Sequence, residues 1–154
     1  MVKGVVRHLL KGSKIVARAR EAGGSLGLNV TSAAGVIEKI NAGFPVRHLD
    51  AFAKVTELPV ETVAAVVRIP SRTLSRRRVE GRLRPDESER LLRVSTLFDK
   101  AVALFEGDNG SALRWLQTSQ PGLGGAVPFE FAKTEVGARE VEDLIGRLEH
   151  GVFT

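Results

Sequence analysis

The apolar residues of this chain recur every three or four positions from residue 31 onward, which is the spacing of one face of a helix. Thr31 or Ser32 can cap the first predicted helix with its hydroxyl group, and Gly43 ends it. Pro45 then stands at a position typical of a helix start. The apolar faces of these two helices consist of Ala33, Val36, Ile37 and Ile40 in the first and Val46, Leu49, Phe52 and Ala53 in the second.

Two shorter helices follow, separated by a break at Ile69 and Pro70. Proline cannot continue the first of them, and Ser71 can cap the second. Leu74 is spaced to face the core, so the second helix turns its arginine-rich side outward. A helix-turn-helix reads the major groove with this arrangement, because the first turns of its second helix meet the base edges. The segment 60–78 therefore predicts a DNA-reading element.

The outward side of this second helix supplies the candidate contacts with DNA. Arginine can bond bidentately to guanine or to phosphate, and serine or threonine can do either more weakly. Arg82 and Arg84 extend the cationic surface and suit phosphate contacts. The predicted DNA-binding residues are Ser71, Arg72, Thr73, Ser75, Arg76, Arg77 and Arg78. The alternative interpretation of this segment is a basic, solvated helix within a bundle.

The rest of the chain predicts three more helices. Pro85 begins a long one, which ends at Gly107 and joins the two halves of the chain. Asp108 or Asn109 can cap a short one. A tight loop rich in glycine and proline then leads to the last helix, which starts at Thr134. The apolar positions are Leu91, Val94, Phe98, Ala101, Val102 and Phe105 in the long helix and Val141, Leu144, Ile145 and Leu148 in the last one.

Strand patterns are weak along the whole chain, which has no tyrosine and few alternating β-branched runs. The predicted fold class is all-α, with an N-terminal helix-turn-helix bundle joined by a long helix to a small helical C-terminal domain. We place a basic N-terminal arm at 1–30, since the glycines at 23–27 break any earlier helix. The DNA-binding domain occupies 31–94 and the C-terminal domain 95–154. The arm either contacts phosphates or is a solvated tail without fixed structure.

Composition narrows the class of protein. The 154 residues are 43% hydrophobic, as in a globular chain, and no run approaches the length of a membrane span. The absence of cysteine excludes disulfides and thiolate metal sites and agrees with a cytoplasmic location. The net charge of +5 is unevenly divided: residues 1–94 carry 18 Lys and Arg against 9 Asp and Glu, and residues 95–154 carry 5 against 9. The first part suits a polyanion, and the second suits a neutral or basic protein surface.

The sequence contains no arrangement typical of an enzyme. His8, His48 and His150 are too scattered to indicate a metal cluster, and no Ser/His/Asp set accompanies a recognisable turn. Adjacent carboxylates such as Glu142 and Asp143 diverge on a helix rather than converge. We therefore expect no catalytic residue, no metal site and no cofactor.

From Glu57 onward the chain resembles the Xre/MbcA/ParS-type antitoxins, the partners of RES-domain toxins in bacterial type II toxin–antitoxin operons. The resemblance rests on IPSRTLSRRR at 69–78, on GRLRPDESERLLRVSTLFDKAVALF at 81–105 and, most specifically, on WLQTSQPGLGGAVPFEFAKTEVGAREVEDLIGRLEHGVF at 115–153. It covers about two thirds of the chain. The positions that match the family's toxin-binding domain are Trp115, Leu116, Pro121, Leu123, Gly124, Gly125, Pro128, Thr134, Gly137, His150 and Gly151.

The resemblance implies two functions. The helix-turn-helix part would bind the promoter of its own operon and repress it, and the C-terminal domain would block the active site of a RES toxin. RES toxins are similar to ADP-ribosyltransferases and use NAD, so their active site should be basic and an acidic domain could plug it. The predicted toxin-binding residues are Glu142, Arg147, Glu149, His150 and Gly151. Two-fold operators would require a homodimer, for which we favour the helices before the DNA-reading element.

Two other functions are compatible with the same residues. The first is a stand-alone helix-turn-helix regulator whose C-terminal domain only dimerises, and the second is an interaction adaptor with no role at DNA. Two residues also depart from the pattern of the wider helix-turn-helix class. Arg68 stands where glycine is typical, and Arg77 stands near an apolar position. Both departures suggest a changed turn and a changed set of base contacts.

Overall fold

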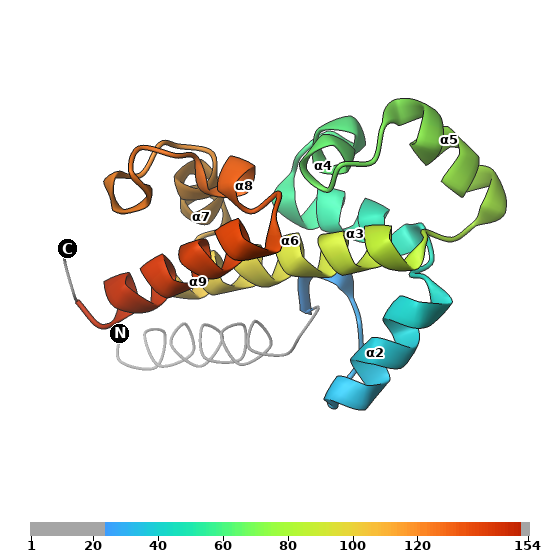
Figure 1. Cartoon of the computed structure of the whole chain (residues 1–154), viewed down its shortest axis with the longest axis horizontal. Coiled ribbons are helices and arrows are strands. Elements are labelled where there is room, and N and C mark those ends of the chain that lie inside the picture. Colours follow the sequence, from blue (N-terminus) through green and yellow to red (C-terminus); the bar gives the residue numbers. More distant parts are fainter. Residues whose placement is uncertain (1–23, 152–154) are drawn as a thin grey trace, which may run out of the picture.

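The computed structural model describes residues 24–151, and its regular elements are helices (Figure 1). An isolated bridge between Pro45 and Arg82 is the only strand-like pairing in that range. The predicted all-α fold class is therefore confirmed. In chain order the elements are η1 (Gly24–Leu26), α2 (Ala33–Ala42), α3 (Arg47–Thr56), α4 (Val60–Val66), α5 (Ser71–Glu80), α6 (Pro85–Leu104), α7 (Asn109–Leu116), η2 (Pro121–Leu123), α8 (Pro128–Phe131) and α9 (Glu135–Glu149).

Helix α6 is the axis of the fold. It is 20 residues long and contacts η1, α2, α7 and α9. Figure 1 shows α2 to α5 grouped around its first half and α7 to α9 around its second half, with α9 running alongside it. The rings of Phe98 in α6 and Phe52 in α3 meet edge to face, with 5.6 Å between their centroids. The two halves of the chain thus share one hydrophobic core instead of forming two separate ones.

Side chains set several helix starts as predicted. The side chains of Ser32, Asp108 and Thr134 each accept a hydrogen bond from a backbone amide of the first turn that follows. Pro85 is the first residue of α6, where its missing amide hydrogen costs nothing. The prediction for Ser71 was wrong, because Pro70 occupies the capping position and no side chain caps α5.

The end of the predicted N-terminal arm belongs to the core. Leu26, Leu28 and Val30 are buried, and η1 packs against α3 and α6. The burial of these apolar side chains fixes residues 24–30 against the helices despite the glycines in this segment. The predicted boundary of the arm at residue 30 was therefore wrong. Residues 1–23 lie outside the described part of the chain.

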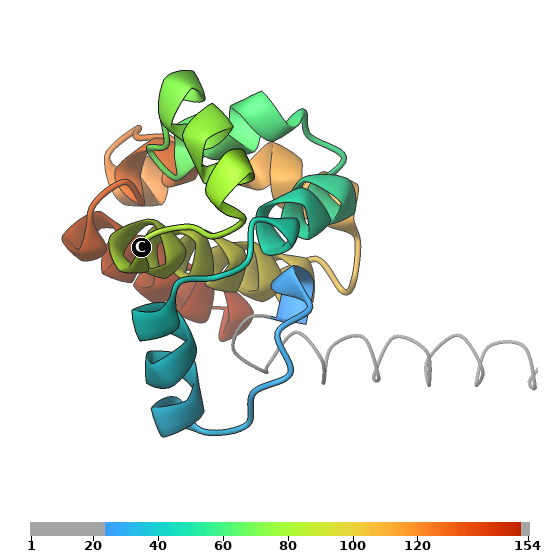
Figure 2. The same ribbon diagram turned by 90° about the vertical axis from the view of Figure 1, so that its right-hand side faces the viewer.

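Helix α2 is the least buried helix of the bundle. Its apolar positions Val36 and Ile40 are only partly covered, and the side chain of Ile37 is 57% exposed. Figures 1 and 2 show α2 standing out from the body of the molecule, with its C-terminal end at α3 and α6. The helical spacing of these residues was predicted, but their apolar face is left largely open.

None of the helices in residues 24–151 combines the length and the apolar content needed to cross a membrane.

A buried carboxylate holds η1 against α6. Asp99 is only 5% exposed, and its Oδ2 atom accepts a hydrogen bond from the backbone amide of Ser25 at 3.4 Å. The hydroxyl of Ser25 donates to the carbonyl oxygen of Ser95 at 3.5 Å. Burial raises the pKa of Asp99 to about 6, although the hydrogen bonds from Ser25 act in the opposite direction.

The charge of Asp99 should therefore destabilise the fold near neutral pH. Its folded pKa lies above the value of about 3.9 in an unfolded chain, so the penalty is full above pH 6 and disappears as the pH falls towards 4. We expect Asp99→Asn to raise the free energy of unfolding by about 1–3 kcal/mol at pH 7.5 and by much less at pH 4. Urea unfolding at both pH values measures this difference.

Asp143→Asn is the matched control, because it removes an exposed carboxylate from α9. It should change stability little at either pH. An Asp99→Asn gain of the same size at pH 7.5 and pH 4 would contradict the assignment.

Candidate functional site

Helices α4 and α5 form a helix-turn-helix. The backbone amide of Ile69 donates to the carbonyl of Ala64 at 2.8 Å, and the buried Ile69 side chain anchors the turn. Arg68 has a φ of 61°, which is the left-handed conformation that glycine adopts without strain. The chain therefore keeps a glycine-like turn with an arginine, at a cost of about 1 kcal/mol. A changed turn, which the sequence suggested, is not observed.

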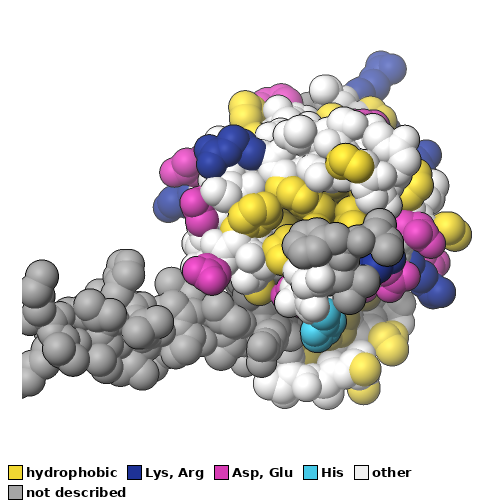
Figure 3. Space-filling view, turned by 90° about the vertical axis from the view of Figure 1, so that its left-hand side faces the viewer, with side chains coloured by type: hydrophobic (Ala, Val, Ile, Leu, Met, Phe, Trp, Pro, Cys, Tyr) yellow, Lys and Arg dark blue, Asp and Glu magenta, His cyan; other side chains and the backbone are white. Residues whose placement is uncertain are grey.

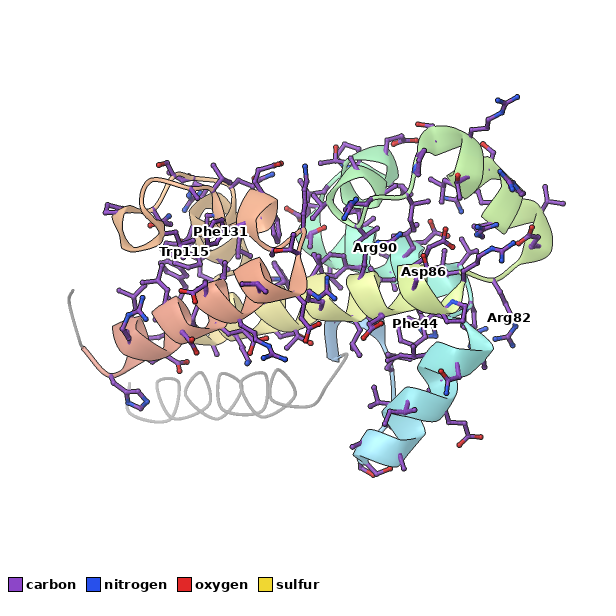
Figure 4. All side chains as sticks on the ribbon, viewed as in Figure 1. Phe44, Arg82, Asp86, Arg90, Trp115 and Phe131 are labelled. Atoms are coloured by element: carbon purple, nitrogen blue, oxygen red, sulfur yellow. The ribbon has the colours of Figure 1, made fainter. Side chains whose placement is uncertain are left out.

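Arg90 of α6 forms hydrogen bonds with this turn, a role that the sequence did not indicate. Its Nε atom donates to the carbonyl of Val67 at 2.7 Å, and its Nη2 atom donates to the carbonyl of Arg68 at 3.4 Å. Its Nη1 atom also donates to Asp86 at 3.1 Å (Figure 4). Because the carbonyls at the end of α4 have no partner within their own helix, Arg90 satisfies them and ties the turn to α6.

The first two turns of α5 present an open polar surface. Ser71, Arg72, Ser75 and Arg76 are exposed, and we call this set the α5 face. Thr73 is half-buried at its edge. Neither arginine of the α5 face forms an ion pair with any residue in 24–151. Helix α5 lies at the outer end of the bundle and is turned towards the viewer in Figure 2.

Arg77 is buried, so the prediction that it contacts DNA was wrong. It is 4% exposed, and its Nε and Nη2 atoms donate to the two carboxylate oxygens of Glu87 at 2.7 and 3.2 Å. The hydrogen bond with Glu87 raises the pKa of Arg77, so it stays charged. The three-residue spacing from the buried Leu74 could have revealed this inward position. Glu87 also accepts from the amide of Arg84 at 2.8 Å, which caps α6.

Arg78 remains at the surface but already has a partner. Its guanidinium donates to both carboxylate oxygens of Asp50 in α3, at 2.9 and 3.1 Å. This pairing raises the pKa of Arg78. With its side chain 43% exposed, Arg78 is still accessible, but a phosphate would have to compete with Asp50.

The predicted toxin-binding residues divide into two places on α9. Glu142 is half-buried and accepts a hydrogen bond from Lys100 of α6 at 2.9 Å, so it helps to fasten α9 to α6. Glu149, His150 and Gly151 are exposed at the end of α9, and Arg147 is half-buried beside them. Figure 3 shows hydrophobic side chains gathered on this end of the molecule, with charged side chains around them.

The glycine-rich loop between α7 and α8 is structural. The amide of Gly125 donates to the carbonyl of Gln120 at 3.0 Å, and the amide of Gln120 donates to Ala126 at 3.0 Å. Gly137 in the first turn of α9 lies so close to the carbonyl oxygen of Phe131 that a Cβ atom would overlap with it. The half-buried Trp115 packs against the core, as a core anchor does (Figure 4).

Comparisons with known proteins agree with this arrangement. Residues 35–95 match the antitoxin Xre-like helix-turn-helix domain, and residues 100–151 match the antitoxin Xre/MbcA/ParS C-terminal toxin-binding domain. Antitoxin Xre of Yersinia enterocolitica is 43% identical over 130 residues, which cover 84% of this chain and 88% of the relative. The chain belongs to the Xre antitoxin family.

Two further Xre antitoxins are similar to this one. The protein from Photorhabdus laumondii is 36% identical over 75% of the chain and 78% of its own length. The protein from Pseudomonas putida is 36% identical over 54% of the chain and 52% of its own length. As an Xre antitoxin, the chain is a regulatory protein with a DNA-binding helix-turn-helix and a toxin-binding C-terminal domain, and it is not an enzyme.

The two arginines that follow each other in α5 should respond differently to truncation. Arg77→Ala leaves the buried Glu87 without its partner, so we expect a loss of about 3–5 kcal/mol in the free energy of unfolding. Arg78→Ala breaks an exposed pair and should cost about 1 kcal/mol or less. Chemical denaturation at neutral pH measures both. Equal losses for the two variants would contradict the buried pair.

Proposed function

We propose that this Xre antitoxin neutralises a RES-domain toxin by covering its active site and represses its own operon as a homodimer. The main support for this proposal is that the two candidate binding surfaces of the chain lie far apart. The α5 face lies at one end of the molecule and the end of α9 at the other, with α6 between them (Figure 1). A helix of 20 residues is about 30 Å long, so DNA and a toxin need not compete for space.

Charged and hydrophobic side chains at the end of α9 support toxin binding. Glu140, Asp143 and Glu149 are exposed along this helix, and His150 and Gly151 continue its end. A toxin site that accepts an anionic dinucleotide should be basic, and an acidic helix end complements it. The hydrophobic side chains in Figure 3 would supply the apolar centre that protein interfaces usually have. Arg147 and Glu142 would support this surface at its edge.

The α5 face supports operator binding. Arg72 and Arg76 are free of acidic partners in the described residues, so their guanidinium groups are available for guanine or phosphate. Ser71 and Ser75 lie on the same surface, and Thr73 lies at its edge. Arg78 would contact a phosphate only if its ion pair with Asp50 broke.

A homodimer would place two such faces on one operator. Two-fold half-sites lie about 34–36 Å apart, which a single small reading head cannot span. We assign the dimer contact to α2, because its Ile37 is exposed and Val36 and Ile40 are only partly covered. A chain that sediments as a monomer at micromolar concentration would oppose this assignment.

The end of α9 can be tested by co-expression with the RES-domain toxin that we propose as its partner. We expect Glu149→Ala/His150→Ala to weaken toxin binding about 10–100-fold and to lower growth rescue accordingly. Both residues are exposed, so the variant should keep its stability. Glu135→Ala/Arg139→Ala removes an exposed ion pair from the first two turns of α9 and serves as the control. Full protection by the first variant would place the inhibitory surface elsewhere.

The α5 face can be tested on promoter DNA. Because each bidentate arginine contributes about 1–3 kcal/mol, Arg72→Ala/Arg76→Ala should weaken specific binding at least tenfold while leaving growth rescue intact. Arg114→Ala/Arg139→Ala removes the same charge from the C-terminal half and should retain DNA affinity. A gel-shift titration measures all three proteins. Unchanged promoter affinity in the first variant would show that another surface reads the operator.

A further inference from the structure

A small basic pocket lies where α2, α3 and the segment after α5 meet. Its volume is about 250 Å³, and its walls include Lys39, Arg47, His48 and Arg82. None of the described residues that line it is acidic. The pocket is below the usual range of about 300–1,000 Å³ for sites of drug-sized ligands, so it fits a single small group. None of the residues of the α5 face belongs to it.

The backbone and several side chains hold this pocket in shape. The amide of Leu83 donates to the carbonyl of Phe44 at 2.8 Å, and the Nη1 atom of Arg82 donates to the carbonyl of Gly43 at 2.8 Å. Gly43 has a φ of 80°, and a Cβ atom there would overlap with the carbonyl oxygen of Leu83. The close approach of the two segments therefore depends on this glycine, and it fixes Arg82 at the rim (Figure 4).

His48 is also fixed in place. Its Nδ1 atom lies 2.7 Å from the carbonyl oxygen of Leu26, so Nδ1 carries a hydrogen and donates it. The ring of Phe44 meets the imidazole edge to face, with 6.1 Å between centroids. His48 and Arg82 thus already have partners and do not need to rearrange when a ligand binds.

The cations of the pocket differ from the other arginines nearby. Arg77 and Arg78 each have a carboxylate partner, whereas Lys39, Arg47 and Arg82 form no ion pair with any residue that the structure describes. Like charges around one concavity repel one another unless an anion lies between them. The donors available, an ammonium group and two guanidinium groups, are those that bind phosphate oxygens.

The position of the pocket indicates where that phosphate comes from. Arg82 directly follows Gly81, the residue that ends α5. In Figure 2, α2 and α5 lie on the same face of the molecule, so a duplex on the α5 face would pass close to the pocket. We propose that the pocket binds a backbone phosphate of the operator, next to the base pairs that α5 reads. This inference rests on the proposed operator binding.

The test is the salt dependence of promoter binding by Lys39→Ala/Arg47→Ala. Loss of one phosphate contact should lower the slope of log K against log salt concentration by about 0.9. Affinity should fall about tenfold near 0.1 M salt, by the same factor on promoter DNA and on a scrambled duplex, because a phosphate carries no base identity. Lys39→Arg/Arg47→Lys keeps both charges. Its slope should differ from that of the wild type by less than about half of the change expected for the alanine variant.

Two controls make the outcome specific. Arg114→Ala/Lys133→Ala removes one arginine and one lysine from the C-terminal half and should leave the slope unchanged. Arg82 is left in place because it also bonds to Gly43. Circular dichroism melting confirms that each variant folds. A slope and an affinity equal to those of the wild type in Lys39→Ala/Arg47→Ala would overturn the inference while leaving the α5 face untouched.

Other outcomes separate the two proposals. If the wild-type chain fails to bind the promoter, or if Arg72→Ala/Arg76→Ala binds it with unchanged affinity, the proposed operator binding by the α5 face is wrong. The inference about the pocket, which rests on it, then fails as well. A second experiment titrates the chain with inorganic phosphate. Binding is followed by the NMR signals of the His48 ring. Saturable binding of free phosphate, together with unchanged DNA binding in Lys39→Ala/Arg47→Ala, would assign the pocket to a free anion and overturn its role at DNA.

Discussion

Helix α6 is buried on several sides, and the other helices are arranged around it. A helix that contacts other elements along most of its length must carry apolar residues around much of its circumference, and here Leu91, Leu97 and Ala101 are completely covered. The few polar groups on its buried sides need partners. Ser88 accepts a hydrogen bond from the amide of Phe44 at 2.8 Å, and Asp99 accepts one from Ser25. Each such bond fastens a neighbouring segment of the chain to α6.

The same helix determines how the two functions of an antitoxin are combined in one small chain. Because the core is continuous along α6, the helix-turn-helix and the toxin-binding part are held in one body. The matched helix-turn-helix region ends at residue 95 and the matched toxin-binding region begins at residue 100, both inside α6. The two parts are therefore joined by packed side chains rather than by a flexible linker.

The arginines around α5 illustrate how one residue type is used in different ways. Arg77 is an internal cation whose charge is satisfied by Glu87, and Arg90 is a support for the carbonyls of the turn. Arg72 and Arg76 have no acidic partner among residues 24–151 and point away from the core. In the sequence alone, these arginines all belong to one basic region of the chain. Burial and carboxylate partners divide them into a structural group and a group available to a polyanion.

The fold class, several helix starts and the family could be inferred from sequence patterns. Apolar spacing, capping residues and prolines act over three or four positions, so Ser32, Pro85 and Thr134 could be assigned from local chemistry alone. The buried faces of α3, α6 and α9 followed from the same spacing.

The pairing of polar side chains could not be predicted in the same way. Arg77 and Glu87 are ten residues apart, Arg78 and Asp50 are 28 apart, and Ser25 and Asp99 are 74 apart. Such pairs depend on how the helices pack, which no local pattern contains. For the same reason only the structure showed that Leu26, Leu28 and Val30 belong to the core, that the apolar face of α2 is largely open and that Lys39, Arg47 and Arg82 line one pocket.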